Sequence, residues 1–256
     1  MRLGIVTYNI GKDWDLPTML KNLEALGYEG VELRTTHKHG VEPSLTAQQR
    51  AEVQTLFKAS PVELVGLGTT CEFQAIEKAT VRKNIEEARE FIRLAHDVGA
   101  AGIKVRPNGV PQGADLNGTL TQIGESLAEV AEFAEGFGVK VRLEVHGETT
   151  SLLPNIAKIL KAAAHTNLWV CWNSNATDVV NGSIASTFPL VANRIDMVHL
   201  HDITDAGYPW RELFRALQRS GYTGFTLAEI AESSDPVRVL RYFRSLWQAY
   251  QPGESN

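Results

Sequence analysis

Acidic and imidazole side chains recur at alternate positions in several short segments of the sequence. The run Leu143–His146 reads Leu-Glu-Val-His, and the run Val198–His201 reads Val-His-Leu-His. A further carboxylate, Glu229, directly follows the short run Phe225–Ala228. Two carboxylates and an imidazole in one site can exchange protons with a substrate or hold a divalent cation. Proton transfer beside a carbonyl group needs such a base, together with a group that stabilises the oxyanion.

The alternation predicts which of these side chains share a face, because successive residues of a strand point to opposite sides. In the segment 139–146 every odd-numbered residue is apolar, so Glu144 and His146 are expected on the other face. The same parity places further polar residues on the inward face, namely Glu32, Arg34, Lys104, Arg106, Arg142, Asn173, His199, His201 and Glu229. Buried carboxylates are costly unless a cation or several donors compensate them. We therefore expect a metal ion or a polyhydroxyl substrate at this face.

The elements that must position these residues are eight short apolar runs separated by amphipathic stretches. The runs begin near Leu3, Gly30, Val62, Gly102, Val139, Leu168, Ile195 and Gly224. Eight strand–helix units favour a closed barrel over an open doubly wound sheet, which would usually carry a glycine-rich first turn. We predict an α/β fold, a single closed (β/α)8 TIM barrel over residues 1–250, with a flexible tail at 251–256. In such barrels the site lies at the C-terminal ends of the strands.

Composition narrows the possible partners. The 256 residues carry 25 Lys plus Arg against 30 Asp plus Glu, a formal net charge of −5, and no basic run. This balance argues against a nucleic acid or an anionic membrane surface as partner. The sequence shows neither the apolar core of a secretion signal nor a run of about 20 apolar residues. We therefore expect a cytoplasmic protein with no membrane partner, and the sequence leaves a homo-oligomer open.

Four segments resemble the xylose-isomerase-like barrel superfamily, which includes sugar isomerases, sugar epimerases, inosose dehydratases and the endonuclease IV branch. They are Gly27–Leu33, Leu143–His146, Val198–Asp202 and Gly221–Gly224 leading to Glu229. The resemblance spans nearly the whole chain and is specific for the superfamily rather than for one reaction. It implies a sugar isomerase or epimerase that moves a proton beside a carbonyl group, with metal assistance.

The resemblance also implies a ligand set for one divalent ion. The family typically uses Glu, Asp, His and Glu on strands five to eight, which match Glu144, Asn173, His199 and Glu229. Asn173 stands where the family usually has Asp, so this chain offers two anionic ligands instead of three. Mn²⁺, Mg²⁺ and Zn²⁺ remain compatible with carboxylate, carbonyl and imidazole ligands. Glu144 and Glu229 are also the expected catalytic acid and base.

Substrate contacts are expected from the remaining inward or nearby polar residues. These are Glu32, Arg34, His39, Arg106, His146 and His201. The loops at 201–207 and 231–235 are acidic, whereas a phosphosugar site would present a glycine-rich anion cradle there. An unphosphorylated sugar or cyclitol is therefore the expected substrate. Two alternatives remain open: a dehydratase or lyase acting on a keto-sugar or keto-glycoside, and a barrel that binds sugar without catalysis.

Overall fold

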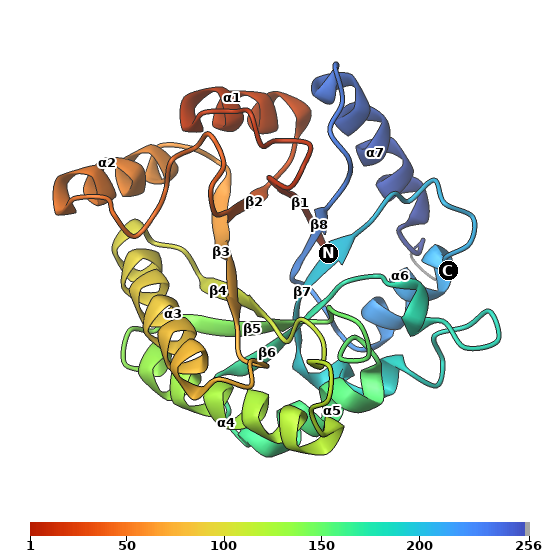
Figure 1. The fold of residues 1–256 in the computed structure, drawn as a ribbon. Helices are drawn as coiled ribbons and strands as arrows, with labels where there is room; N and C mark the ends of the chain where they lie inside the picture. Colours follow the sequence, from red (N-terminus) through yellow and green to blue (C-terminus); the bar gives the residue numbers. More distant parts are fainter. Residues whose placement is uncertain (254–256) are drawn as a thin grey trace.

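Eight short strands run parallel and close on themselves, each pairing with the next in sequence and the last pairing with the first. This computed structural model describes residues 1–253, and it confirms the predicted closed (β/α)8 barrel. In Figure 1 the strands occupy the centre and the helices form an outer ring. Of the predicted tail at 251–256, residues 254–256 lie outside the described residues. No helix in residues 1–253 has the length and apolar character needed to cross a bilayer.

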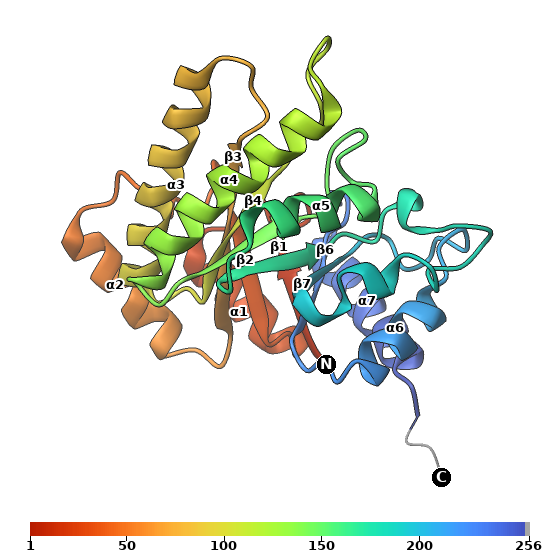
Figure 2. The same cartoon turned by 90° about the horizontal axis from the view of Figure 1, so that it is seen from below.

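The strands are β1 (Arg2–Val6), β2 (Gly30–Arg34), β3 (Glu63–Glu72), β4 (Gly102–Arg106), β5 (Lys140–Glu144), β6 (Leu168–Trp172), β7 (Ile195–Leu200) and β8 (Phe225–Ala228). The α-helices are α1 (Leu16–Leu26), α2 (Ala47–Lys58), α3 (Lys78–Val98), α4 (Leu116–Glu135), α5 (Leu153–Ala163), α6 (Trp210–Arg219) and α7 (Pro236–Tyr250). Figure 2 shows the longest helices, α3 and α4, lying side by side against one flank of the barrel.

Local sequence explains where these helices begin and end. The carboxylate of Asp15 accepts a hydrogen bond from the backbone N–H of Thr18 at 2.9 Å and so caps the first turn of α1. Pro17 follows in that first turn, and Gly27 ends the helix with a φ of 69°. Between these signals the helix buries one apolar face, formed by Leu16, Met19, Leu20, Leu23 and Leu26.

The sixth strand–helix unit differs from the expectation. Eight complete units were predicted, but the chain between β6 and β7 forms three short 3₁₀-helices, η1 (Ala176–Asp178), η2 (Phe188–Leu190) and η3 (Ala192–Arg194). This segment contains Gly182, Pro189 and several Asn, Ser and Thr residues, which favour turns over a continuous α-helix. The prediction of a complete sixth unit is therefore wrong, although the closed barrel is unaffected.

The barrel interior follows the predicted parity. Outward residues such as Val141 and Trp172 belong to the main core beneath the helices. A second apolar cluster consists of Val6, Val65, Cys171, Met197, Phe225 and Leu227. Glycines on β3 make room for large inward side chains, since a Cβ on Gly68 would lie 2.7 Å from Glu32 Oε1. A Cβ on Gly66 would likewise lie 2.9 Å from a nitrogen of Arg142. Small residues on β3 thus let charged side chains from β2 and β5 enter the barrel.

A buried hydrogen-bond network holds the loop that follows β6. Trp172 Nε1 donates to the hydroxyl of Tyr208 at 3.0 Å, and this hydroxyl donates to Asp178 Oδ2 at 3.2 Å. The backbone N–H of Asn175 donates to the same oxygen at 2.8 Å. Asp178 is fully buried, and this burial raises the pKa of its carboxyl to about 7. The network fixes the chain on both sides of Asn173, the residue predicted to face the site.

Ionisation of Asp178 is expected to weaken the fold as pH rises. Its pKa lies above the ordinary value of 3.8 in the folded chain, so its stabilising contribution is complete below about pH 4 and is lost as pH rises to about 7. This interval of about three pH units corresponds to a decrease of at most about 4 kcal/mol in the free energy of unfolding. Asp178→Asn should remove this part of the pH dependence. Urea denaturation of the wild type and the variant between pH 4 and 8 measures this pH dependence of the free energy of unfolding.

The exposed Asp13 provides the control, because its side chain is 83% accessible. Asp13→Asn should leave the pH dependence of the free energy of unfolding as it is in the wild type. If Asp178→Asn shows the same slope as Asp13→Asn, the buried carboxyl is not responsible.

Candidate active site at the C-terminal end of the barrel

Three predicted site residues converge at the ends of their strands. Glu144 ends β5, His199 lies near the end of β7, and Glu229 directly follows β8. The Nδ1 atom of His199 is 3.3 Å from Glu144 Oε1 and 3.3 Å from Glu229 Oε2. The side chains of Glu144 and His199 are 3% and 0% exposed, whereas that of Glu229 is 15% exposed. The imidazole therefore sits between two carboxylates, of which Glu229 is the more open.

Asn173 follows directly after β6 and is buried. Its side-chain oxygen Oδ1 is inaccessible and has no hydrogen-bond partner within the described residues. An unpaired amide oxygen in this position is costly and needs a partner that the protein itself does not provide. A bound cation or a substrate hydroxyl would provide it.

Glu32 lies on the other side of the imidazole. His199 Nε2 is 3.5 Å from Glu32 Oε1, and both side chains are fully buried. Among residues 1–253 neither carboxylate oxygen of Glu32 has a hydrogen-bond partner. A carboxylate behind an imidazole favours the tautomer with the proton on the nearer nitrogen, which leaves the other nitrogen free to bind a cation. In this site Glu32 faces Nε2, so Nδ1 is the nitrogen that faces the two other carboxylates.

Lys104 provides a positive charge within the barrel. Its Nζ donates a hydrogen bond to Glu144 Oε2 at 2.8 Å, and the two side chains are 7% and 3% exposed. Burial would lower the pKa of Lys104, but Glu144, Glu32 and Glu229 outweigh it and raise this pKa above its ordinary value. Burial would raise the pKa of Glu144, but Lys104 and His199 lower it to about 2. Glu144 is therefore a carboxylate at neutral pH.

The imidazole and Glu229 influence each other in the same way. Burial would raise the pKa of Glu229, but His199 lowers it well below its ordinary value. Burial would lower the pKa of His199, but Cys171, Glu229 and Glu32 raise it well above its ordinary value. The site thus favours a positive charge at the position of the imidazole.

The arrangement fits a divalent cation. Glu144, His199 and Glu229 each offer a ligand atom, and these atoms lie within 4.8 Å of one another. Atoms bound to one ion at about 2.1 Å are themselves about 3.0–3.4 Å apart. Both distances from His199 Nδ1 to the carboxylates fall in that range. The unpaired Oδ1 of Asn173 is a fourth candidate donor. These residues are of the types that Mn²⁺, Mg²⁺ or Zn²⁺ accept as ligands.

Two further predicted residues lie beside this cluster. His201 Nε2 is 3.4 Å from Glu229 Oε2, and its side chain is 41% exposed, so it lies at the entrance. His146 follows β5 and is half-buried, and its Nδ1 has no hydrogen-bond partner in the described part of the chain. Burial lowers the pKa of His146, so this ring is neutral at physiological pH. Contact of these two imidazoles with a substrate stays a prediction.

Three other predicted residues contact their own loop or the neighbouring strand. His39 Nε2 donates to the backbone oxygen of Arg34 at 2.8 Å, while its Nδ1 accepts from the backbone N–H of Val41 at 3.0 Å. Arg34 donates to the backbone oxygen of Thr35 at 2.8 Å. Arg106 contacts Glu72 at 3.4 Å. Both ring nitrogens of His39 are used by the backbone, so its geometry is that of a loop support.

Sequence reasoning placed Lys104 on the inward face without a role, and it gave no role to Asp178. The signal for Lys104 was its inward position on β4, the strand next to β5, where Arg142 is its register partner and Glu144 lies two residues further on. Nothing in the sequence around Asp178 distinguishes it from an ordinary loop aspartate, since only the fold buries it beside Tyr208.

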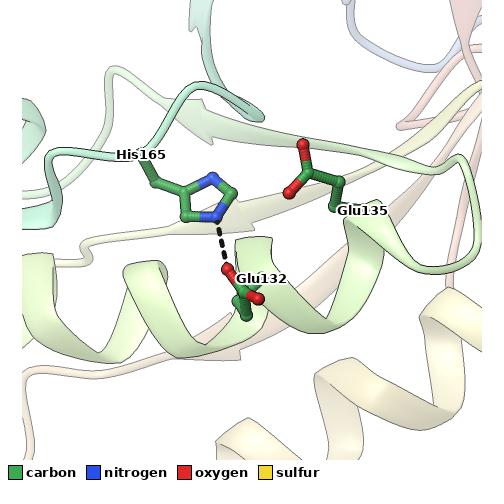
Figure 3. Close-up of side chains that lie close together, drawn as sticks. All are labelled: Glu132, Glu135 and His165. Carbon is green, nitrogen blue, oxygen red and sulfur yellow. Dashed lines mark hydrogen bonds and ion pairs between the residues drawn. The ribbon is translucent and has the colours of Figure 1, made fainter.

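A second cluster of potential ligands lies on the outer surface. Glu132 and Glu135 of α4 approach His165, and all three are partly or fully exposed (Figure 3). His165 Nδ1 accepts from the backbone N–H of Asn167 at 3.1 Å, which places the ring proton on Nε2. Nε2 then donates to Glu132 Oε2 at 3.1 Å. Neither ring nitrogen has a free lone pair, so this cluster is a surface hydrogen bond rather than a metal site.

Comparison with known proteins agrees with this fold. The model of the Xylose isomerase-like TIM barrel family matches residues 20–246. The chain belongs to this family. The match includes all four residues of the candidate ligand set, from Glu144 to Glu229.

Individual members of the family are distant in sequence. Fructoselysine 3-epimerase of Shigella flexneri is 21% identical over 229 residues, which cover 82% of this chain and 83% of that protein. D-psicose 3-epimerase of Clostridium cellulolyticum H10, solved with D-tagatose, superposes with a TM-score of 0.83 at 15% identity, covering 98% of this chain and 99% of that one. The IOLI protein, solved with a bound zinc atom, gives a TM-score of 0.78 at 14% identity, covering 98% and 97%. At such identities the superpositions show a shared fold.

The role of Asn173 can be tested by restoring a carboxylate. Asn173→Asp adds a full negative charge at the ligand position, so Mn²⁺ should bind about tenfold more tightly. Calorimetric titration of Mn²⁺ into chelator-treated protein measures the affinity. Asn117→Asp, an exposed position on α4, adds the same charge far from the cluster and should leave the affinity unchanged. Unchanged Mn²⁺ affinity together with a lower melting temperature in Asn173→Asp would exclude Asn173 as a ligand.

Proposed function

We propose that this protein is a sugar isomerase or epimerase that moves a proton beside the carbonyl group of an unphosphorylated sugar or cyclitol. The observation that carries the proposal is the convergence of Glu144, His199 and Glu229 on one point at the C-terminal end of the barrel. In (β/α)8 enzymes that end is where the active site lies. The epimerases among the distant relatives support the same reaction class.

Glu229 is the carboxylate best placed to remove a carbon-bound proton. Its Oε2 faces His199 and His201, whereas its Oε1 makes no hydrogen bond within residues 1–253. Because His199 keeps this group ionised, it can accept a proton and return it. His201 at the entrance and the neutral His146 can donate hydrogen bonds to substrate oxygens. Glu144, Asn173, His199 and Glu229 would hold the metal ion.

When bound there, a divalent cation would polarise the carbonyl and hydroxyl oxygens of the substrate and stabilise negative charge on them. A solved protein of the same fold carries zinc, which supports such an ion in this chain. Glu32 would hold the imidazole of His199 with Nδ1 facing the ion.

The surroundings of the site favour an uncharged substrate. The loops after β7 and β8 carry Asp202, Asp205, Glu232 and Asp235. Of these, Glu232 pairs with Lys12 at 2.5 Å, and Asp202 accepts from the backbone N–H of Thr204 at 2.9 Å. Such loops would repel a phosphate group, which instead needs backbone donors or basic side chains. Polyhydroxyl compounds without phosphate are therefore the proposed substrate class.

A lyase or dehydratase acting beside a ketone is a second candidate. One observation favours it: of the two carboxylates in the cluster, only Glu229 has an oxygen without a partner, because Glu144 contacts Lys104 and His199. Elimination needs one base to remove the proton, whereas inversion at one carbon needs proton exchange on both faces. The two reactions differ in their products and can be separated directly.

A substrate screen in D₂O tests the proposal. Protein loaded with Mn²⁺ is incubated with free ketoses, aldoses, inososes and keto-glycosides, and products are followed by proton NMR and mass spectrometry. Deuterium incorporation at carbon, in a product that differs only in configuration or in the position of its carbonyl group, supports the isomerase or epimerase. Loss of water or of an aglycone supports the lyase. Saturable binding without deuterium incorporation in any compound contradicts catalysis and supports a sugar-binding barrel.

Removing either carboxylate should abolish turnover of the substrate found in the screen. Glu229→Gln and Glu144→Gln keep side-chain volume but remove charge and basicity, so we expect losses of at least about 10²-fold in kcat. Asp196→Asn is the matched control, because Asp196 pairs with Arg142 at the opposite end of the barrel. It should retain turnover close to that of the wild type. Wild-type rates in either glutamine variant, with a native circular dichroism spectrum, would place the chemistry elsewhere.

A further inference from the structure

The two carboxylates of the cluster are not equivalent, and the difference lies in Lys104. Its Nζ lies 2.8 Å from Glu144 Oε2 in an almost fully buried pair. The other oxygen of Glu144, Oε1, faces His199 Nδ1 at 3.3 Å. Both oxygens of Glu144 are therefore engaged. Glu229 directs only Oε2 towards His199 and His201.

Strand register gives Lys104 a fixed place below the cluster. Lys104 pairs in register with Arg142, so Glu144 lies two residues further towards the C-terminal end of β5. On its other side Lys104 pairs with Gly68, whose missing side chain leaves space that Glu32 Oε1 occupies. The ammonium group thus reaches up to Glu144 from a deeper layer and has Glu32 as a second nearby carboxylate.

We propose that Lys104 is a positioning residue that withdraws Oε2 of Glu144 from the site, so that Glu144 offers a divalent cation one oxygen and the cation binds weakly. This inference rests on the metal site of the proposed function but not on the reaction. Two effects act in the same direction. The ammonium group competes with the cation for Glu144, and its positive charge opposes a second positive charge a few ångströms away. The neutral ligand at Asn173 adds no charge to offset them.

The ion pair between Lys104 and Glu144 also has a simpler explanation, in which it only stabilises the packing of β4 against β5. An ion pair of that kind stabilises the fold but leaves cation affinity unaffected. Mn²⁺ affinity of metal-free protein therefore distinguishes the two explanations, and it requires no knowledge of the substrate. The structural explanation instead predicts a change in melting temperature alone.

The experiment compares Mn²⁺ binding by calorimetry or electron paramagnetic resonance in a set of variants. All are made in a Glu132→Gln/Glu135→Gln background, which removes the surface carboxylates of Figure 3 as adventitious binders. Lys104→Met should tighten Mn²⁺ binding by about tenfold or more, because it frees Oε2 and removes the opposing charge. Lys104→Arg, which keeps the charge, should stay within about threefold of the unsubstituted protein.

A double-variant comparison shows whether Lys104 acts through Glu144. In a Glu144→Gln background, Lys104→Met should tighten Mn²⁺ binding by less than it does when Glu144 is present, because no carboxylate oxygen is released and only the opposing charge is removed. Lys104→Leu provides the same readout if Lys104→Met fails to fold, since it also removes both the charge and the hydrogen bond to Glu144. Unchanged or weaker Mn²⁺ binding in whichever of the two folds overturns the proposal.

The outcomes also separate this proposal from the proposed function. If the unsubstituted protein binds Mn²⁺ and Lys104→Met leaves the affinity unchanged, the positioning role of Lys104 is wrong and the metal site stands. If only the Lys104 variants bind Mn²⁺, the positioning role stands and metal assistance in the native protein is wrong. If none of the proteins binds Mn²⁺, both are wrong.

Discussion

Three carboxylates inside a barrel need positive partners, and most features of this structure follow from that requirement. Glu32, Glu144 and Glu229 surround the fully buried imidazole of His199, and Lys104 reaches Glu144 from below. Removing ionised groups from water is costly unless each finds a partner of opposite charge. Within the described residues the basic side chains that contact these carboxylates are Lys104, His199 and His201. The surplus of negative charge is what makes a divalent cation a physically reasonable addition.

The barrel allows this concentration of charge because its strands divide the interior between large and small side chains. Gly66 and Gly68 of β3 leave space for Arg142 and Glu32. At the opposite end, Arg142 donates to Asp196 at 2.7 Å and to the backbone oxygen of Val65 at 2.8 Å, which satisfies a second set of buried charges. On β5, therefore, the inward residue Arg142 makes structural contacts, and the next inward residue, Glu144, belongs to the candidate site.

Hydrogen bonds hold two of the loops at the C-terminal end of the barrel. The loop after β6 is fixed through Asp178, Tyr208 and Trp172, and His201 joins it through a hydrogen bond from its backbone N–H to Ser174 at 3.0 Å. The loop after β2 is supported by His39, whose two ring nitrogens bind backbone groups. Such supports hold the ligand-bearing residues in place without occupying the site, which is the condition for precise positioning of catalytic groups.

The sequence by itself determined the barrel and the face on which the chemistry lies. Alternation in the runs around Glu144 and His199 is a property of extended chains, so the inward residues could be read from their numbering. Only the tertiary structure decided which inward residues touch. The contact between Lys104 and Glu144, the burial of Asp178 and the inward support role of His39 depend on register and packing between segments distant in the chain. A loop without strong periodicity, such as the one between β6 and β7, likewise takes its 3₁₀ form from its surroundings, because turn-forming residues there specify no regular helix.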